Sequence, residues 1–138
     1  AVCYENATME WIDGNIGSQI NMKYPGTILR GDNSKGVCIS IAVAKNGQFQ
    51  DAGARMIHEG KNTSSQIISK SIVRDGGISN YRGTARIMKN ATGSKTHIEC
   101  DTLILDSRSK SDTIPKKRFS ATFLVIFNLV LSNNSVTI

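Results

Sequence analysis

Hydrophobic and polar residues alternate over short segments in the middle of the chain, and alternation with a period of two is typical of half-buried β-strands. Residues 37–44, which read Val-Cys-Ile-Ser-Ile-Ala-Val-Ala, form the clearest such segment. Their branched residues, Val37, Ile39, Ile41 and Val43, lie on one face. We predict a strand whose branched face is buried and whose opposite face leaves the Cys38 thiol exposed.

Two later segments alternate in the same way. Between residues 81 and 87, Tyr, Gly, Ala and Ile occupy every second position, with Arg and Thr between them. Between residues 97 and 104, Cys100 shares a face with Ile98 and Ile104. A cysteine that shares a strand face with isoleucines behaves as a small buried hydrophobic residue. We therefore expect Cys100 to be nearly inaccessible in the folded protein.

Turn-forming residues separate these strands. Clusters of Asn, Asp, Ser and Gly tolerate a positive φ or bond to their own backbone, and they occur at residues 32–36, 46–47, 75–77 and 90–93. No stretch before residue 115 sustains a helical period. The pattern therefore predicts an all-β protein.

The spacing of the units leaves two architectures open. Apolar segments begin near residues 53, 66, 81 and 97. The intervals between these starts are longer than the roughly 8–12 residues of an antiparallel sandwich, and they suit stacked coils that share a continuous core. Spacing alone favours the coils without excluding the sandwich.

Composition and charge narrow the functional classes. A chain of 138 residues with 39% hydrophobic and 20% charged residues fits one folded domain. The formal net charge is +6, and Lys116, Lys117 and Arg118 supply three of those charges. The remaining cations are interleaved with acids, without an RNA-binding signature. We therefore expect no nucleic-acid partner.

The cysteines and the first residues bear on the compartment. Cys3, Cys38 and Cys100 are an odd set, widely scattered along the sequence and without a CxxC pair. Residues 1–6 show neither the basic nor the apolar region of a secretory signal. We expect a reducing, cytoplasmic location and no membrane association. The absence of an initiator Met suggests a fragment of a longer protein.

An ordered series of motifs resembles the SufB/SufD family, which forms the scaffold of the SUF system for iron–sulfur cluster assembly. Within that family the residues of these motifs are of the SufB type. The series covers residues 1 to about 115 and consists of Trp11, Lys23-Tyr24-Pro25, Ile28-Leu29-Arg30-Gly31, Gln50-Asp51-Ala52-Gly53-Ala54, Met56-Ile57-His58, Asn62-Thr63-Ser64-Ser65, Ile67-Ile68-Ser69-Lys70, Tyr81-Arg82-Gly83, Glu99-Cys100-Asp101 and Asp112-Thr113-Ile114-Pro115.

The resemblance implies a fold and a set of partners. The family core is a right-handed parallel β-helix, and this chain would form its later rungs. Such a scaffold is not an enzyme: it works with the SufC ATPase, the SufD paralogue and a cysteine desulfurase, and it holds a transient iron–sulfur cluster in the full complex. The alternative of another class is a β-helix polysaccharide lyase or hydrolase, because fold alone does not fix function.

The chain departs from the family pattern near its end. Ser109 stands where some relatives carry a cluster-anchoring cysteine, and a hydroxyl is a poorer iron ligand than a thiolate. The Glu-His-Glu-Ala motif that follows in the family is missing. We therefore predict a partial family core at residues 1–115. Residues 116–138 are predicted to be a divergent tail of the kind that a frameshift produces.

Candidate site residues follow from the resemblance and from residue type. The candidates for sulfur or cluster binding are Cys3, Cys38, Cys100, Asp106 and Asp112. The two aspartates flank the expected cluster region. His58 and His97 offer imidazoles that suit iron, but single histidines near strands are usually ordinary hydrogen-bonded groups. No metal ligand set is assigned, and we expect this chain alone to hold no stable cluster.

Overall fold

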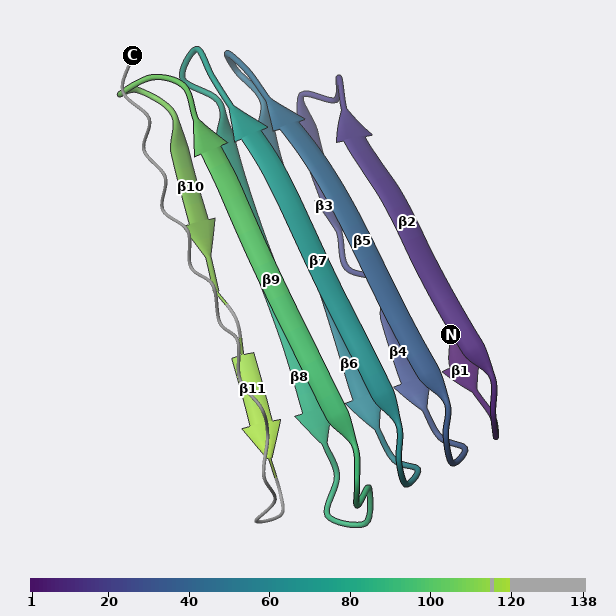
Figure 1. Cartoon of the computed structure of the whole chain (residues 1–138). Helices are drawn as coiled ribbons and strands as arrows, with labels where there is room; N and C mark the ends of the chain where they lie inside the picture. Colours follow the sequence, from purple (N-terminus) through teal and green to yellow (C-terminus); the bar gives the residue numbers. More distant parts are fainter. Residues whose placement is uncertain (115, 120–138) are drawn as a thin grey trace.

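The structure, a computed structural model, describes residues 1–114 and 116–119. Within these residues the fold is all-β, without a helix, and its parallel strands wind into a β-solenoid of about four turns (Figure 1). The strands are β1 (Val2–Cys3), β2 (Thr8–Ile16), β3 (Ile20–Lys23), β4 (Gly26–Leu29), β5 (Lys35–Ala44), β6 (Phe49–His58), β7 (Ser64–Val73), β8 (Ile78–Ile87), β9 (Lys95–Ile104), β10 (Lys110–Thr113) and β11 (Lys116–Phe119).

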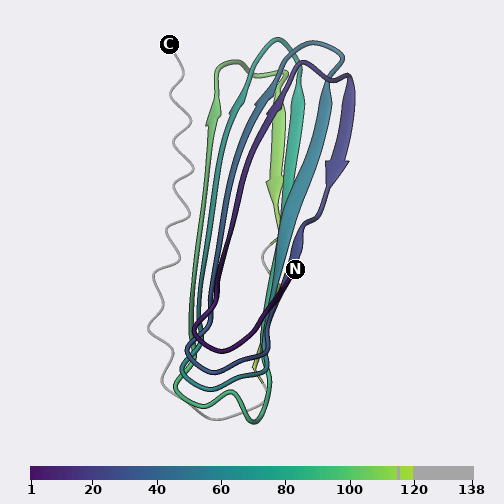
Figure 2. The ribbon, with the colours of Figure 1, turned by 90° about the vertical axis from the view of Figure 1, so that its right-hand side faces the viewer.

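Two parallel sheets face each other across a narrow interior (Figure 2). The first sheet has the order β1-β4-β6-β8-β10, with β3 beside β6 and β11 beside β8. The second sheet has the order β2-β5-β7-β9. Successive long strands alternate between the sheets, and every pairing is parallel. The predicted parallel β-helix is therefore confirmed, and the antiparallel sandwich is excluded.

One coil contains one strand from each sheet. Strands of the second sheet start at residues 35, 64 and 95, an interval within the range expected of solenoid repeats. The shorter units predicted from the sequence therefore correspond to half a coil, a strand with its turn. Adjacent strands pair in register along their whole length, from Lys35↔Ser64 to Ala44↔Val73.

Stacked asparagines shape the turns at one end of the solenoid. Asn6, Asn33 and Asn62 all have positive φ, at 58°, 58° and 54°, and asparagine tolerates this left-handed conformation better than most residues. The Asn33 amide donates to the Asn6 side-chain oxygen at 3.3 Å. In the next coil Gly93 (φ 72°) takes the equivalent place. A Cβ there would lie 2.2 Å from the Asn62 side-chain oxygen, which would have to move, and the positive φ further favours glycine.

The prediction of the buried face of β5 was wrong. Cys38 is 1% exposed and points into the interior, whereas Ile41 on the branched face is 48% exposed. Along β5 the inward side chains are all small, namely Cys38, Ser40, Ala42 and Ala44, and the bulkier residues of this strand stack outside on their neighbours in adjacent coils. Ile39, for example, pairs with Ile12 and Ile68. Such cross-strand pairs of branched residues stabilise a sheet even when half exposed.

The predictions for the two later strands fared better. In β8, the alternating residues Tyr81, Gly83, Ala85 and Ile87 are all buried. In β9, Cys100 points inward beside buried Ile98, as predicted. Cys100 is nevertheless only half-buried, because β9 is the last strand of its sheet in the described part and no further coil covers it.

The segment predicted to be a divergent tail, residues 116–138, falls mostly outside the described residues. Its first part forms β11, which pairs with β8. Residue 115 and residues 120–138, including the apolar run 123–131, lie outside that range. No helix that could cross a membrane occurs in residues 1–114 or 116–119.

Candidate functional site

Two of the predicted cysteines lie in the interior of the solenoid, both near Tyr81. Cys38 pairs with Ile67, and Ile67 pairs with Ile98, so Cys100 is two strands and two residues away from Cys38, about 12 Å between Cα atoms. Cys38 on β5 belongs to the main buried cluster together with Tyr81, and Cys100 packs against that cluster. Cys38 lies in register with Trp11, and Cys100 lies in register with Ser69 on the neighbouring strand. We call this group, Cys38, Cys100 and Tyr81, the thiol site.

An ion pair lies beside the thiol site. Asp13 on β2 binds the ammonium group of Lys23 on β3 at 3.0 Å, and the Asp13 side chain is only 8% exposed. Burial raises the pKa of Cys38 to about 11, with a further increase from Asp13 and an opposing effect of Lys23. Cys38 is therefore a protonated thiol at neutral pH, and reaction as a nucleophile requires removal of its proton.

Tyr81 places an unused hydroxyl between the sheets. Its side chain is 5% exposed, and its oxygen has no hydrogen-bond partner among the described residues. Burial raises the pKa of Tyr81, and the neighbouring Cys38 and Cys100 raise it further. The hydroxyl therefore stays protonated and remains able to donate to a group bound near the two sulfurs. A buried polar group without a partner is costly, which sets Tyr81 apart from its surroundings.

A polar network continues from the thiol site toward the ends of the second-sheet strands. Asn15 donates to the Ser40 hydroxyl at 3.2 Å and accepts from Asn21 at 2.6 Å. Ser71 and Thr102 bond to each other at 2.7 Å. Gln50 donates to a backbone oxygen at 2.8 Å, but its own side-chain oxygen is unpaired among the described residues.

The remaining predicted residues do not join the thiol site. Cys3 is buried beside the start of β5, where its sulfur contacts the Lys35 carbonyl oxygen at 3.9 Å. Burial raises the pKa of Cys3. Asp112 is exposed on β10. These residues have the side chains that sulfur or cluster binding needs, but the fold separates them from Cys38 and Cys100.

Asp106 holds a turn together. Its carboxylate accepts the Ser109 hydroxyl at 2.8 Å and the backbone N–H groups of Arg108 and Ser109 at 2.8 and 2.9 Å. These bonds, the Ser109 hydroxyl first, lower the pKa of Asp106 to about 2. Ser109 also accepts from the Gly76 N–H at 3.1 Å. Both side chains are therefore committed to the β9–β10 turn.

His58, one of the two imidazoles considered from the sequence, forms a second buried polar group. It is fully buried, and its two ring nitrogens contact the hydroxyls of Thr63 and Ser65 at 2.7 and 2.9 Å. Burial lowers the pKa of His58 to about 4, so the ring is neutral at physiological pH. With both nitrogens bonded to hydroxyls, His58 is a structural group here and offers no free ligand position.

The donor set of the interior does not complete a metal site. Across residues 1–114 and 116–119, no three His, Cys, Asp or Glu side chains are close enough together to hold a metal ion. Cluster ligation requires several converging thiolates or imidazoles. The thiol site supplies two thiols, which are too few to ligate a cluster.

Comparison with known proteins identifies related chains. A family model described as "SUF system FeS cluster assembly, SufBD core domain" matches residues 1–122. The chain is 60% identical over 114 residues to the iron-sulfur cluster assembly protein SufB of Bacillus subtilis, covering 83% of this chain and 24% of that protein. It is 58% identical over 112 residues to a SufBD family iron-sulfur cluster assembly protein of Staphylococcus saprophyticus. A Staphylococcus aureus relative is 57% identical over the same length. The chain therefore spans about a quarter (24%) of these relatives.

Proposed function

Because the chain belongs to the SufB/SufD family of the SUF iron–sulfur cluster assembly system, we propose that it forms part of a scaffold subunit for cluster assembly. The observation that carries this proposal is the family match over residues 1–122. The interior positions of Cys38 and Cys100, both near Tyr81, support it. In the whole complex the partners would be a SufC-type ATPase, a SufD-type paralogue and a cysteine desulfurase.

The role proposed for the thiol site is to receive sulfur. Cys100 is the half-buried member and so is the one that a donor can reach. In the transfer step the Cys100 thiolate attacks the outer sulfur of a donor persulfide, and the donor cysteine leaves as a thiolate. The Tyr81 hydroxyl, which has no partner among the described residues, can donate a hydrogen bond to the transferred sulfur, while Cys38 stays a protonated thiol. Burial is the main cause of the raised pKa of Cys38, with Asp13 adding to it and Lys23 opposing it.

The competing function, cleavage of polysaccharides, has less support. Lyases and hydrolases of this type use paired carboxylates that are free to act as acid and base. Asp106 is bound into its turn, and Asp51 is paired with Arg82. Incubation with acidic and neutral polysaccharides is the direct test, and measurable cleavage would overturn the scaffold proposal.

The sulfur-transfer role is tested by trapping persulfide. The chain, assembled anaerobically with SufC- and SufD-type partners, would be supplied with a loaded cysteine desulfurase, and persulfide sulfur would be located by mass spectrometry. We expect Cys100→Ser to reduce labelling at least about tenfold, because the nucleophilic thiolate is lost. Cys3→Ser serves as the matched control and should label like the unaltered chain. Equal labelling of all three variants, Cys38→Ser included, would remove the thiol site from the proposal.

A second test addresses the cluster itself. The isolated chain should hold no stable iron–sulfur cluster after anaerobic reconstitution, because the described residues supply no complete ligand group. The assembled complex should show cluster absorbance in the visible range. A cluster band that survives gel filtration of the chain without partners would contradict the division of ligands between subunits.

A further inference from the structure

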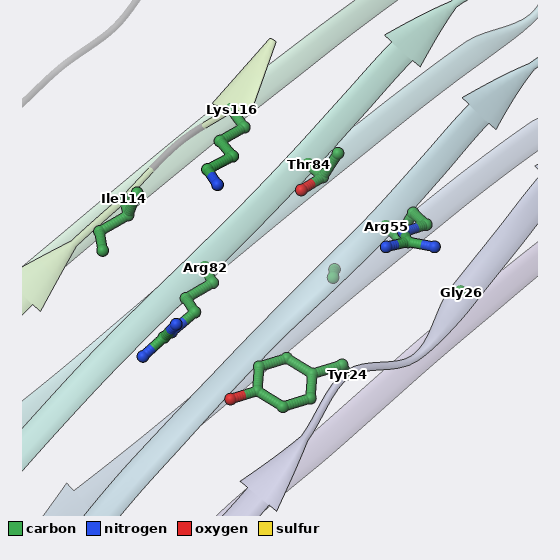
Figure 3. Close-up of a pocket in the computed structure, with 8 residues that line it drawn as sticks. Tyr24, Gly26, Arg55, Arg82, Thr84, Ile114 and Lys116 are labelled. Atoms are coloured by element: carbon green, nitrogen blue, oxygen red, sulfur yellow. The ribbon is translucent and has the colours of Figure 1, made fainter. Parts of the chain in front are cut away.

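The outer face of the first sheet carries a hollow that the proposed function does not use. It has a volume of about 440 Å³, and we call it the Thr84 hollow (Figure 3). Its walls come from β6 and β8, from Tyr24 and the start of β4, and from Ile114 and Lys116. The lining residues are Tyr24, Gly26, Ala54, Arg55, Arg82, Thr84, Ile114 and Lys116.

Glycines at two positions make the surface concave. Gly26 pairs with Arg55 in one cross-strand row, and Gly53 pairs with Arg82 in the next. Neither glycine raises a side chain above the sheet. The Tyr24 ring lies over Gly53, and a Cβ at Gly53 would come within 2.9 Å of the Tyr24 Cδ1 atom. The floor is therefore backbone and the short Thr84 side chain, with an aromatic ring at one side.

Two cations flank the Thr84 hydroxyl on consecutive strands. Arg55 pairs with Thr84, and Thr84 pairs with Lys116. Neighbouring strands lie about 4.8 Å apart, so the Cα atoms of the two cations are separated by about 10 Å. Their long side chains can close on a ligand placed over Thr84. Figure 3 shows both side chains at the rim of the hollow.

The charges at the hollow are not balanced. Arg82 binds Asp51 through two contacts of 3.0 and 3.2 Å, so its charge is neutralised. Within the part of the chain that the structure describes, Arg55 and Lys116 form no ion pair, the Thr84 hydroxyl forms no hydrogen bond, and no acid lines the hollow. On the same sheet Arg86 and Arg118 pair in a nearby row. The hollow therefore offers positive charge and a hydroxyl donor to an anion.

We propose that the Thr84 hollow binds a phosphate group. A guanidinium and an ammonium match the charge of a phosphate dianion, and the guanidinium can bind two of its oxygens at once. The Thr84 hydroxyl donates to a third oxygen. Tyr24 provides a face for a flat apolar substituent, so an aryl phosphate ester binds more tightly than inorganic phosphate. This proposal does not depend on the scaffold role of the interior.

Calorimetric titration of the full chain with phenyl phosphate and with inorganic phosphate tests the proposal. Both should bind saturably, phenyl phosphate the more tightly. Arg55→Ala should weaken binding of both by about tenfold or more, the effect of removing one charge-assisted contact. Lys116→Ala should act in the same direction. Tyr24→Leu should affect phenyl phosphate alone. Lys45→Ala, which removes an exposed cation on a distant turn, is the matched control and should leave binding unchanged.

Three results would overturn the proposal. These are the absence of saturable phosphate binding, an equal effect of Arg55→Ala and Lys45→Ala, and binding of benzoate as tight as that of phenyl phosphate. The last result would show that the hollow recognises any aromatic anion. Circular dichroism of each variant checks that the fold is retained, and the exposed positions of Arg55 and Lys116 make them tolerant of substitution. Loss of sulfur labelling in the interior would leave this result untouched.

Discussion

The two halves of the interior are built from the same strands by different means. The apolar half contains Cys38, Met56, Ile67, Ala85 and Ile98, which fill space without needing partners. The polar half contains the bonded pairs Asn15–Ser40 and Ser71–Thr102, and Gln50, which donates to the Ser18 carbonyl oxygen. Burial of polar groups is tolerable only when they are paired. The contrast teaches that packing stabilises the apolar half, which includes Tyr81, whereas hydrogen bonds stabilise the polar half. Each half leaves one side-chain oxygen without a partner among the described residues, that of Tyr81 and that of Gln50.

The largest effect on stability is expected from removing a large side chain from the apolar half. Ile67 is fully buried, so Ile67→Ala should lower the free energy of unfolding by about 4 kcal/mol through lost burial and a residual cavity. The matched control is Ile68→Ala, since Ile68 is its half-buried neighbour on the outer face. Ile68→Ala should lower the free energy of unfolding clearly less than Ile67→Ala does. Urea denaturation measures both, and equal costs would mean that the interior is no more tightly packed than the surface.

Acid should destabilise the fold through His58. The folded pKa near 4 lies below the ordinary value of 6.5, so the unfolded chain takes up this proton first as the pH falls. Stability is complete above about pH 6.5 and declines until about pH 4, where the accumulated loss is about 3 kcal/mol. Denaturation at several pH values should show this decline. His58→Gln should flatten it across this pH range, and an unchanged slope in that variant would assign the effect to other groups.

Within the polar half, a residue with several partners should matter moderately. Asn15→Ala removes the donor to Ser40 and the acceptor for Asn21. The expected loss of unfolding free energy is about 2 kcal/mol, because buried partners are left without hydrogen bonds. Thermal or urea unfolding measures it. Asn21→Ala, which removes only one end of the network, should cost less, and the reverse order would show that Asn15 is not the centre of the network.

The smallest effect is expected where a polar group has no partner. Tyr81→Phe removes only the unpaired hydroxyl, so stability should stay within about 1 kcal/mol of the unaltered chain or rise slightly. If the hydroxyl serves the thiol site, the same variant should slow sulfur transfer to Cys100. A large loss of stability in Tyr81→Phe would mean that the hydroxyl has a partner in solution and that the division of the interior is drawn in the wrong place.

The sequence predicted the strands well because period-two alternation is a local property. It located β5, β8 and β9, and the turn clusters between them. Alternation alone does not say which face of a strand points inward when both faces carry apolar or small residues, and β5 is such a strand. The small face, with Cys38 and Ala42, is buried because the facing sheet leaves little room.

The candidate site was less predictable because its members are far apart in sequence. Parallel stacking of coils places Cys38 and Cys100 near Tyr81. The Asp13–Lys23 pair joins different strands, and no local sequence pattern predicts it. The Thr84 hollow likewise depends on cross-strand register between β6, β8 and β11. The family resemblance supplied the fold and the system, but not these contacts.

The asparagine ladder at the turns has a consequence for how the chain can change length. The stacked positions 6, 33, 62 and 93 are unevenly spaced, and the interval lengthens from one coil to the next, while β5, β7 and β9 keep the same length. Insertions and deletions are therefore absorbed at the turns between strands. One residue added within β7 would move its Ser69 and Ser71 side chains to the outer face and bring their neighbours inside. The turns of the solenoid can therefore accept added residues, whereas its strands cannot accept a single added residue without reversing their faces.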